Sequence, residues 1–321
     1  MARVLVTRPL TEGGTDPLLE AGHEVVVRED GGALTPEELV GLAAECDGIV
    51  CHLTDRIDTA VLESGRAGRL RVVANAAVGY DNIDVVSATK MGITVCNTPG
   101  VLDDTTADLA FLLILTATRL ASDAEQDLRE GRWTGWGFGT HLALDVHGAT
   151  LGLVGFGRIA RAVAQRAQGF DMEVIHTTRN DTGLPGFVPT LDELLERSDI
   201  VSLHVPLSPA TRHLIGATEL ARMKPTAVLV NTARGPVVDE DALVDALESG
   251  SIYAAGLDVF DGEPAVNPRV LRAPRTTLLP HIGSATIATR TRMARLACQG
   301  VCDVLAGRTP PNVVVPAPQP H

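Results

Sequence analysis

The stretch ATLGLVGFGRIARAVAQRA, residues 149–167, decides the fold. It begins with an apolar run typical of a buried strand and ends with the apolar spacing of a helix. Between them lies G-x-G-x-x-A, in which Gly155 makes a tight turn, Gly157 lets the backbone approach a pyrophosphate, and Ala160 leaves room for helix against strand. The helix N-terminus then offers free N–H groups to phosphates, so the pattern predicts a dinucleotide site. A plain tight turn is the alternative interpretation.

The end of the following strand indicates which dinucleotide is preferred. An acidic residue about 20 positions after the turn usually bonds the ribose hydroxyls. Here Thr177, Thr178 and Arg179 occupy that place, and Asp181 comes too late. Two hydroxyls and a guanidinium accept a 2′-phosphate, which a carboxylate would repel. The sequence therefore favours NADP(H), with NAD(H) possible; a solvated Arg179 that serves neither is the alternative.

The remainder of the chain alternates between strand and helix patterns, which predicts an α/β fold with parallel sheets. The expected strands cover residues 4–7, 22–27, 48–51, 71–75 and 93–97 before the glycine turn, and 173–178, 199–206, 226–233 and 254–260 after it. We expect two doubly wound domains. A discontinuous, flavodoxin-like substrate-binding domain covers 1–98 and 286–321, and a Rossmann-type dinucleotide-binding domain covers 99–285.

Helix boundaries are marked by capping residues. Thr35 is an expected N-cap, with Pro36 in the first turn and Glu38 three residues on. Further helices are expected to start at Thr190 and at Asp239, and the second of these is expected to stop at Gly250. The last expected helix covers about 285–306.

A different kind of segment lies between the two sets of strands. Residues 97–120 contain a long helix that is apolar all round, which indicates burial between domains or subunits. Residues 121–148 are rich in Gly and hold both tryptophans, Trp133 and Trp136, so we expect an arm or loop there, not a core element. Aromatic anchors on such a segment are common at interfaces.

Composition limits the classes of partner. The chain has 321 residues, 45% of them hydrophobic, and a net charge of -13, which disfavours nucleic acid and anionic membranes as partners. The N-terminus shows no cleavable apolar segment, so we expect a cytoplasmic protein. The five cysteines are scattered and odd in number, which fits a reducing compartment and predicts packing roles without a metal site.

Polar residues follow three later strand patterns. Arg234 follows VLVNTA, Glu263 follows GLDVFDG and His281 follows TTLLP. The carboxyl ends of strands face the ligand crevice in a doubly wound sheet, so the three side chains are expected to converge. Taken singly, each has a plainer interpretation as a surface charge or a packed histidine. Their combination with the nucleotide turn points to a site.

These residue types suit hydride transfer to a 2-oxo acid. Arg234 can clamp the carboxylate and polarise the adjacent carbonyl. A protonated His281 can donate to the carbonyl oxygen, and Glu263 can bind the far imidazole nitrogen, which orients the ring and favours its charged form. A dinucleotide supplies the hydride.

The chain resembles the D-isomer-specific 2-hydroxyacid dehydrogenase family over essentially its whole length. The motifs that carry the resemblance are VGYDNID (78–84), DDTTADLA (103–110), LGLVGFGRIA (151–160), NTARGPVVDEDAL (231–243), AAGLDVFDGEP (254–264) and LLPHIGSAT (278–286). The resemblance implies that Arg234, Glu263 and His281 are catalytic. It also implies a homodimer formed through the arm at about 100–148.

The same resemblance implies further contacts. The backbone at Val78 and Gly79 would hold the substrate carboxylate, together with Arg234 and His281, and Ser284 would border the substrate. Residues implied to contact the cofactor are Thr106, Gly155, Gly157, Arg158, Ile159, Thr177, Thr178, Arg179, Val205, Pro206, Thr211, Thr232, Ala233, Asp258, which would face the nicotinamide carboxamide, and Gly283.

Within the family the chain is most similar to glyoxylate and hydroxypyruvate reductases. The signals are CHLTDRID (51–58), the arm with its tryptophans, and the strand that ends in Thr-Thr-Arg. Trp136 is a candidate to reach the partner's active site. His52 departs from the pattern, because an apolar residue is more usual beside the substrate loop. D-lactate, D-glycerate and phosphite dehydrogenases remain alternatives, as does a non-catalytic nucleotide-sensing protein on the same fold.

Overall fold

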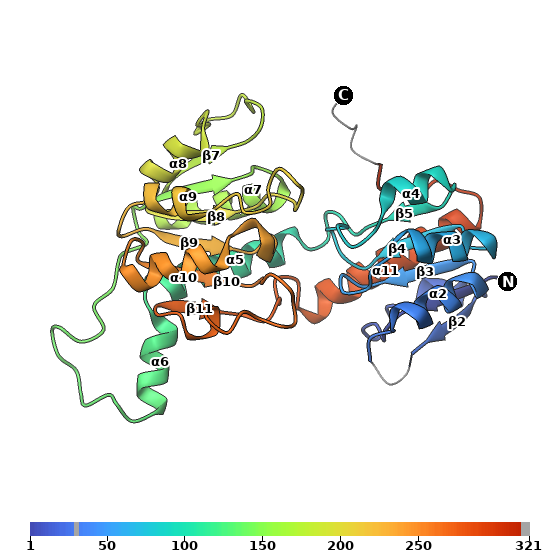
Figure 1. Cartoon of the computed structure of the whole chain (residues 1–321), viewed down its shortest axis with the longest axis horizontal. Helices are drawn as coiled ribbons and strands as arrows, with labels where there is room; N and C mark the ends of the chain where they lie inside the picture. The colour runs from blue at the N-terminus through green and yellow to red at the C-terminus, as the bar shows by residue number, and fades with distance from the viewer. Residues whose placement is uncertain (29–31, 316–321) are drawn as a thin grey trace. The chain divides into compact units, whose positions relative to one another are not determined.

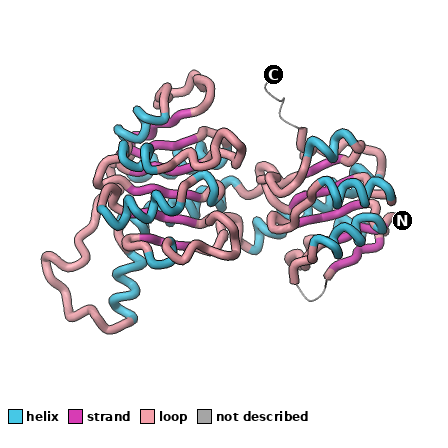
Figure 2. The backbone as a smooth tube through the Cα atoms, viewed as in Figure 1, coloured by secondary structure: helices cyan, strands magenta, loops and turns pink. Residues whose placement is uncertain are grey.

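The computed structural model of the chain describes residues 1–28 and 32–315, so the end of the expected substrate-binding domain, 316–321, lies outside the described residues. The chain divides into two compact units (Figure 1). Unit 1 comprises Met1–Leu102 and the segment from Ser284 onward, and unit 2 comprises Asp103–Gly283. Each unit is a parallel sheet covered by helices (Figure 2). The predicted α/β fold class is confirmed.

Unit 1 contains a five-stranded sheet in the order β2-β1-β3-β4-β5. The strands are β1 (Arg3–Val6), β2 (Glu24–Val27), β3 (Gly48–Cys51), β4 (Val72–Asn75) and β5 (Thr94–Cys96), and all neighbours are parallel. This is the strand order of flavodoxin-like sheets. In such sheets the order in which strands are added reverses between the first and third strands, while all strands stay parallel. Ligands bind such sheets at the carboxyl ends of the strands, near that reversal.

Alternate residues of these strands bury their side chains on opposite faces, as the pleat requires. Leu5 packs with the helices α2 (Pro36–Glu45), α3 (Thr59–Ala67) and α4 (Val85–Lys90). Its neighbours Val4 and Val6 pack on the other face with α1 (Asp16–Glu20) and α11 (Ile287–Leu305). Both faces are therefore covered, which explains why the strands are continuous apolar runs.

The chain returns to unit 1 after unit 2. Helix α11 contributes Ala297, Cys298 and Val301 to the core of unit 1, all fully buried. The segment after it pairs antiparallel with β5 through Val313, and the Val314 N–H donates to the Val95 carbonyl at 2.8 Å. Unit 1 is thus assembled from two distant parts of the sequence.

Unit 2 contains a six-stranded parallel sheet in the order β11-β10-β9-β8-β6-β7. The strands are β6 (Thr150–Val154), β7 (Glu173–Thr177), β8 (Ile200–Leu203), β9 (Val228–Asn231), β10 (Ala254–Leu257) and β11 (Thr276–Leu278). One face packs on α5 (Asp103–Thr118) and α7 (Arg158–Ala167), and the other on α8 (Leu191–Arg197), α9 (Ala217–Arg222) and α10 (Glu240–Ser249). Strand order reverses between β6 and β8, which places the switch point beside the glycine turn.

Capping residues set the helix boundaries as predicted. The Thr35 hydroxyl accepts from the Glu38 N–H at 3.2 Å, and the Glu38 carboxylate accepts from the Thr35 N–H, which completes a capping box. Thr190 and Asp239 cap α8 and α10 through their side chains, and Gly250 ends α10 with φ +74°. The four predicted boundary residues are therefore confirmed.

Three strand predictions were too long. Strand β8 ends at Leu203 and not at 206, and β10 ends at Leu257 and not at 260. Strand β9 covers Val228–Asn231, two residues shorter at each end than the predicted 226–233. The apolar run continues after β8 and β10, but Pro206 lacks the N–H that a ladder requires. In β10 the chain turns away after Asp258, whose N–H still bonds the Asn231 carbonyl at 3.0 Å.

The arm is more regular than expected. Residues Ala121–Arg129 form a helix, α6, where the sequence predicted loop, and no residue of α6 is buried. The following loop projects from unit 2 (Figure 1) and exposes four large apolar side chains: Trp133, Trp136, Phe138 and Leu142. Among the residues that the structure describes, no single helix is long and apolar enough to cross a membrane; α5 and α6 meet those criteria only as a pair bent by 67°.

Candidate active site

The carboxyl edge of the unit 2 sheet collects the predicted residues of that unit, because every strand of the sheet runs in the same direction. Gly155 follows β6, Arg179 follows β7, and Val205 and Pro206 follow β8. The later strands are followed by the remaining predicted residues, in chain order Thr232, Ala233, Arg234, Asp258, Glu263, His281 and Gly283.

The glycine turn has the geometry that the sequence predicted. Gly155 has φ +89°, and a Cβ there would lie 2.7 Å from the His204 carbonyl oxygen, so only glycine fits. Gly157 is the N-cap of α7 and provides no side-chain cap to the first helical N–H groups, at Arg158 and Ile159. Ala160 is fully buried against the strand. The turn therefore leaves N–H groups available for an anion at the start of α7.

The end of β7 is tied to this turn. The Gly155 N–H donates to the Thr177 carbonyl at 2.9 Å, and the Thr177 side chain is buried. The Thr178 hydroxyl donates to the Asn180 carbonyl at 2.5 Å, while Arg179 is exposed. Asp181 accepts from the Gly183 N–H at 2.8 Å, so this carboxylate stabilises a local turn. The strand end thus presents an exposed guanidinium and no carboxylate in the usual place.

Two threonines at the neighbouring strand ends differ in their roles. The Thr211 hydroxyl donates to the Pro206 carbonyl at 2.6 Å and accepts from the Ser208 N–H, so it holds its own loop together. The Thr232 hydroxyl is buried and has no hydrogen-bond partner within the described parts of the chain. A buried hydroxyl without a partner is costly, which indicates that a ligand completes this position. The turn, the strand end and Thr232 together fit a bound dinucleotide.

The His281 ring is paired with Glu263. His281 Nδ1 lies 2.7 Å from Glu263 Oε2, and the other carboxylate oxygen accepts from the Phe260 N–H at 2.7 Å. Burial tends to raise the pKa of Glu263, but the hydrogen bonds from His281 and Phe260 outweigh burial and the pKa is lowered. The charged carboxylate therefore fixes the ring by its Nδ1–H and leaves Nε2 for a substrate.

The backbone of His281 is held in an unusual conformation. Its φ is +54°, in the left-handed region that residues with a Cβ seldom adopt. The His281 N–H donates to the Asp258 carbonyl at 2.9 Å, and the Asp258 carboxylate accepts from the N–H groups of Ile282 and Gly283 at 2.7 and 2.8 Å. Asp258 thus stabilises the strained turn on both sides of the ring.

Arg234 lies close to the same pair. Its positive charge is one of the causes that lower the pKa of Glu263, and its Nη1 donates to the Ala233 carbonyl at 2.8 Å. Gly235 follows it, and a Cβ there would collide with the Phe260 backbone. The structure therefore brings Arg234, Glu263 and His281 to one place, as the sequence predicted.

Thr106 and Gly283 complete this edge. Thr106 is buried on α5, and a Cβ placed on Gly283 would lie 3.5 Å from its methyl group and 3.1 Å from the Asp258 carboxylate. These contacts put Thr106 and Asp258 close to the Gly283 backbone. No group of three or more His, Cys, Asp and Glu side chains in residues 1–28 and 32–315 is arranged to hold a metal ion.

The predicted substrate residues Val78, Gly79 and Ser284 belong to unit 1 and are described within it. The Val78 and Gly79 carbonyls accept from the side chains of Asn97 and Asn75, both at 2.7 Å. In the described chain, neither Val78 nor Gly79 uses its N–H in a hydrogen bond. The segment after β4 is therefore held by hydrogen bonds to its carbonyls, and its two backbone N–H groups remain available as donors.

Comparison with known proteins places the chain in a family. A model of the D-isomer specific 2-hydroxyacid dehydrogenase NAD binding domain matches residues 111–283, more than half of the chain. The chain belongs to this family. It is 46% identical to a glyoxylate reductase of Korarchaeum cryptofilum over 97% of this chain and 95% of that protein. It is 44% identical to a glyoxylate reductase of Thermococcus onnurineus, with the same two coverages.

Solved structures of the family agree. A protein from Thermus thermophilus superposes with a TM-score of 0.91 at 44% identity, covering 98% of this chain and 100% of that one. An NADPH-dependent glyoxylate/hydroxypyruvate reductase from Sinorhizobium meliloti, solved with NADP and malonate, gives 0.85 at 35% identity, covering 97% and 96%. This 2-hydroxyacid dehydrogenase is therefore an oxidoreductase with a nicotinamide cofactor, and the predicted family is confirmed.

Three asparagines support the functional segments, and the sequence interpretation gave them no role. Asn231 ends β9, accepts from the Ala233 N–H at 3.0 Å and donates to the Arg234 carbonyl at 2.8 Å, so it shapes the turn that carries Arg234. Asn75 ends β4, and Asn97 follows β5; both hold the 78–79 segment. The sequence signal that could have identified them is an asparagine at the end of an apolar strand. Such an amide is buried and must therefore form hydrogen bonds.

Asp258 gives the dehydrogenase a testable pH dependence. Burial raises its pKa from 3.8 to about 6, although the two N–H donors oppose this shift. The folded state therefore binds more protons than the unfolded state between these values. The stability contributed by the neutral carboxyl is fully present below the unfolded value of 3.8 and is lost as the pH rises through about 6.

We expect the free energy of unfolding of the wild type to fall, relative to Asp258→Asn, by roughly 2–3 kcal/mol as the pH rises across that window. The amide cannot titrate and loses one acceptor oxygen, which adds an offset that is constant with pH. Urea unfolding of both proteins at several pH values across the window measures the difference. Parallel stability curves would contradict the assignment.

Proposed function

We propose that this dehydrogenase reduces small 2-oxo acids, above all glyoxylate and hydroxypyruvate, to D-2-hydroxy acids. The observation that carries the proposal is the 2.7 Å contact between His281 Nδ1 and Glu263, beside Arg234 and on the edge of the sheet that bears the nucleotide turn. Curated relatives named glyoxylate reductase, 42–46% identical over 97% of the chain, support the choice of substrate.

The reaction needs a hydride donor, an acid and a carboxylate clamp. A bound nicotinamide dinucleotide supplies the hydride. Arg234 binds the substrate carboxylate and polarises the carbonyl, and His281 donates the proton from Nε2 to the carbonyl oxygen. Glu263 accepts from Nδ1–H and orients the ring so that Nε2 faces the substrate. In the oxidative direction the same ring takes the proton from the hydroxyl.

Unit 1 contributes backbone N–H groups to the proposed site, and no charged side chain. The free N–H groups of Val78 and Gly79 bind the substrate carboxylate, and the amide contacts from Asn75 and Asn97 keep the two carbonyls turned to unit 1. Two backbone donors on adjacent residues can bind one carboxylate. A related reductase has been solved with malonate, a carboxylate ligand, which supports this role.

NADP(H) is the proposed cofactor, with NAD(H) as the less favoured one. The strand end at Thr177, Thr178 and Arg179 lacks the acid that would repel a 2′-phosphate, and Arg179 is exposed for contact. The related reductase from Sinorhizobium meliloti is named NADPH-dependent and was solved with NADP. These two observations support the preference.

Replacing Arg179 by Ala tests this preference. We expect the KM for NADPH to rise roughly tenfold, since one charge-assisted contact to the 2′-phosphate is lost, while the KM for NADH stays within about twofold. Arg197→Ala is the matched control, because Arg197 is a surface arginine of the same unit that pairs with Glu193 at 3.1 Å. An equal loss for both nucleotides would remove Arg179 from phosphate binding.

We also propose that the protein forms a homodimer through the arm. Its proposed location is the cytoplasm. Trp136 and Phe138 lie edge to face at 5.4 Å and are 80% and 88% exposed, which is unusual unless a partner covers them. In a dimer Trp136 would reach the partner's active site. Sedimentation of the wild type and of Trp136→Ser tests the arm; a wild type that sediments as a monomer at micromolar concentration would exclude it.

Steady-state kinetics test the function as a whole. NADPH and NADH oxidation are measured in parallel with glyoxylate, hydroxypyruvate, pyruvate and a bulkier 2-oxo acid. Rapid turnover of the first two with NADPH supports the proposal in full. Turnover only of pyruvate indicates the D-lactate alternative, and turnover only of phosphite with the oxidised cofactor indicates the phosphite alternative. Turnover of hydroxypyruvate but not of glyoxylate indicates the D-glycerate alternative, since oxidation of D-glycerate is the reverse of hydroxypyruvate reduction. Tight nucleotide binding with no turnover indicates a nucleotide-sensing protein.

A further inference from the structure

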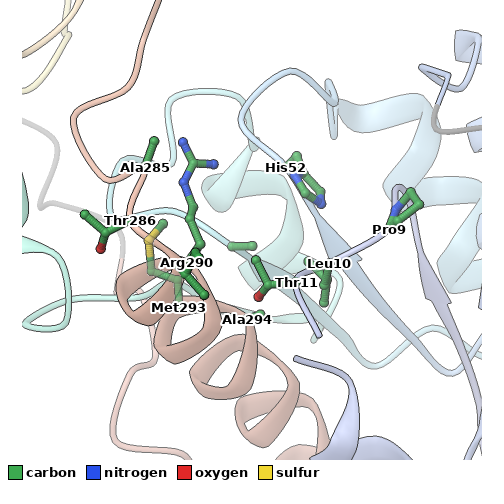
Figure 3. A pocket seen from close by; sticks show the side chains of 11 residues that line it. Pro9, Leu10, Thr11, His52, Ala285, Thr286, Arg290, Met293 and Ala294 are labelled. Atoms are coloured by element: carbon green, nitrogen blue, oxygen red, sulfur yellow. The ribbon is translucent and has the colours of Figure 1, made fainter. Parts of the chain in front are cut away.

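The pocket of unit 1 shown in Figure 3 lies beside the substrate segments already proposed. Ala76 and Ala285 line it, and in the sequence they are close to the Val78–Gly79 segment and to Ser284. This pocket therefore forms part of the proposed substrate site. The contacts that the proposed chemistry leaves unexplained lie in unit 2, in the loop that follows β10.

That loop binds two carboxylates at two successive backbone N–H groups. The Phe260 N–H donates to Glu263 Oε1 at 2.7 Å, and the other oxygen of this carboxylate faces the acid–base histidine. The next N–H, that of Asp261, donates to Glu240 Oε1, also at 2.7 Å. Glu240 lies at the start of α10, 21 residues earlier in the sequence. The loop that ends at Glu263 is therefore tied to α10 by the side chain of Glu240.

The same peptide unit contacts the turn that carries Arg234. Gly235 is the next residue, and a Cβ placed on it would collide with the Phe260 carbonyl group and the Asp261 nitrogen. The two backbones therefore meet with no space for a side chain between them. The peptide bond from Phe260 to Asp261, whose N–H is bound by Glu240, is thus the point where that turn meets the loop.

Glu240 is buried in a place that is unfavourable for a carboxylate. It is 9% exposed, and burial raises its pKa; the Asp261 N–H opposes the shift, and the negative charges of Asp261, Asp241 and Glu263 add to it. Helix α10 does not require this carboxylate as its cap, because Asp239 provides one through its side chain. Buried carboxylates beside like charges are typical of functional sites, which indicates that Glu240 serves the site and not only the helix.

We propose that Glu240 is a positioning residue for the proton transfer. By holding the Asp261 N–H, it fixes the loop in the conformation that directs Glu263 toward the His281 ring. It also keeps the turn of Arg234 packed against that loop. In this role Glu240 contacts neither substrate nor cofactor and acts through Glu263. The inference rests on the proposed function and adds to it a residue that sets the rate of turnover.

Two conservative variants separate the reach of this side chain from its charge. Glu240→Gln keeps an oxygen at the same distance and removes the charge, whereas Glu240→Asp keeps the charge and shortens the side chain by one methylene group. We expect kcat for glyoxylate to fall by no more than about threefold in Glu240→Gln and by roughly 10- to 100-fold in Glu240→Asp, because a small displacement of reacting groups is costly. The KM for NADPH should change less than about threefold in both variants.

A role limited to helix stability predicts the opposite order of the two variants. Glu240 lies in the first turn of α10, where negative charge is favourable, so Asp would preserve the free energy of unfolding and Gln would lower it. In that case kcat per folded molecule would remain at the wild-type value in both. Urea unfolding, measured beside the kinetics, therefore distinguishes a loss of stability from a loss of positioning.

Glu219→Asp is the matched control. Glu219 lies in the first turn of α9, and its carboxylate accepts from the Gly216 N–H at 3.0 Å, so it makes the same kind of contact to a different loop. Its replacement should leave kcat unchanged.

A double-mutant cycle with Glu263 tests whether Glu240 acts through that residue. Glu263→Gln is expected to lower kcat by itself. Adding Glu240→Asp to it should cost less than about twofold further, because the carboxylate that Glu240 positions is no longer present. If Glu240→Asp lowered kcat by the same factor with and without Glu263→Gln, the two residues would act independently and the inference would be wrong.

The inference and the proposed function fail in different ways. A wild type that reduces glyoxylate, with equal kcat in the two Glu240 variants, whether high or low, overturns the inference and leaves the proposed function intact. A wild type that reduces no 2-oxo acid, glyoxylate included, overturns both together.

Discussion

His281→Gln is expected to lower kcat for glyoxylate by roughly 100- to 10,000-fold, the usual contribution of a positioned acid–base group. Gln keeps a hydrogen-bond donor and similar bulk but cannot transfer a proton at neutral pH. The KM for NADPH should change by less than about threefold, because the ring meets the substrate and not the phosphates. Steady-state kinetics under saturating cofactor and with the cofactor varied measure the two quantities.

His147→Gln is the control for this variant. His147 also faces a carboxylate, with Nδ1 at 3.6 Å from Asp171, but it precedes β6 and so lies at the opposite edge of the sheet. Its replacement should leave kcat unchanged. If His281→Gln turned over at the wild-type rate, His281 would have no acid–base role, and the pairing with Glu263 would serve only to stabilise the turn.

Arg234→Gln is expected to reduce kcat/KM for glyoxylate by roughly 100- to 1,000-fold. The substrate carboxylate loses charge-assisted hydrogen bonds, which contribute about 1.5–3 kcal/mol each, and the carbonyl loses the adjacent positive charge. Arg234→Lys keeps the charge but not the two-pronged geometry, so its kcat/KM should fall between the two. Both KM and kcat should be affected, since the clamp acts before and during hydride transfer.

The control for Arg234 is Arg222→Gln. Arg222 is an exposed arginine of α9 in the same unit, and it pairs with Asp192 at 3.2 Å. It should show wild-type kinetics and a small loss of stability at most. Wild-type kcat/KM in Arg234→Gln, with glyoxylate as the substrate, would rule out the carboxylate clamp.

Local rules predicted the parts of the fold that depend on neighbouring residues. Gly155 and Gly157 must lie in a tight turn before a helix, and Thr35 with Glu38 must cap one, whatever the remainder of the chain does. Parallel strand direction then predicted that Arg234, Glu263 and His281 would gather at one edge. These predictions required only the sequence pattern and the geometry of a doubly wound sheet.

Features set by tertiary contacts could not be predicted in this way. The left-handed backbone of His281 depends on hydrogen bonds to Asp258, 23 residues earlier in the sequence, and no local pattern signals it. The amide contacts of Asn75 and Asn231 likewise depend on how the following turns fold. Helix α6 was missed because the Gly- and Trp-rich loop after it dominated the interpretation of residues 121–148.

The return of the chain to unit 1 has a consequence for synthesis on the ribosome. Every strand of unit 2 precedes α11, whereas the core of unit 1 lacks one covering layer until α11 and the segment through Val314 have been made. Until then, the apolar face formed by Val4, Val6 and Val50 has only α1 to shield it. We therefore expect the N-terminal unit to complete its fold last, although its strands are synthesised first.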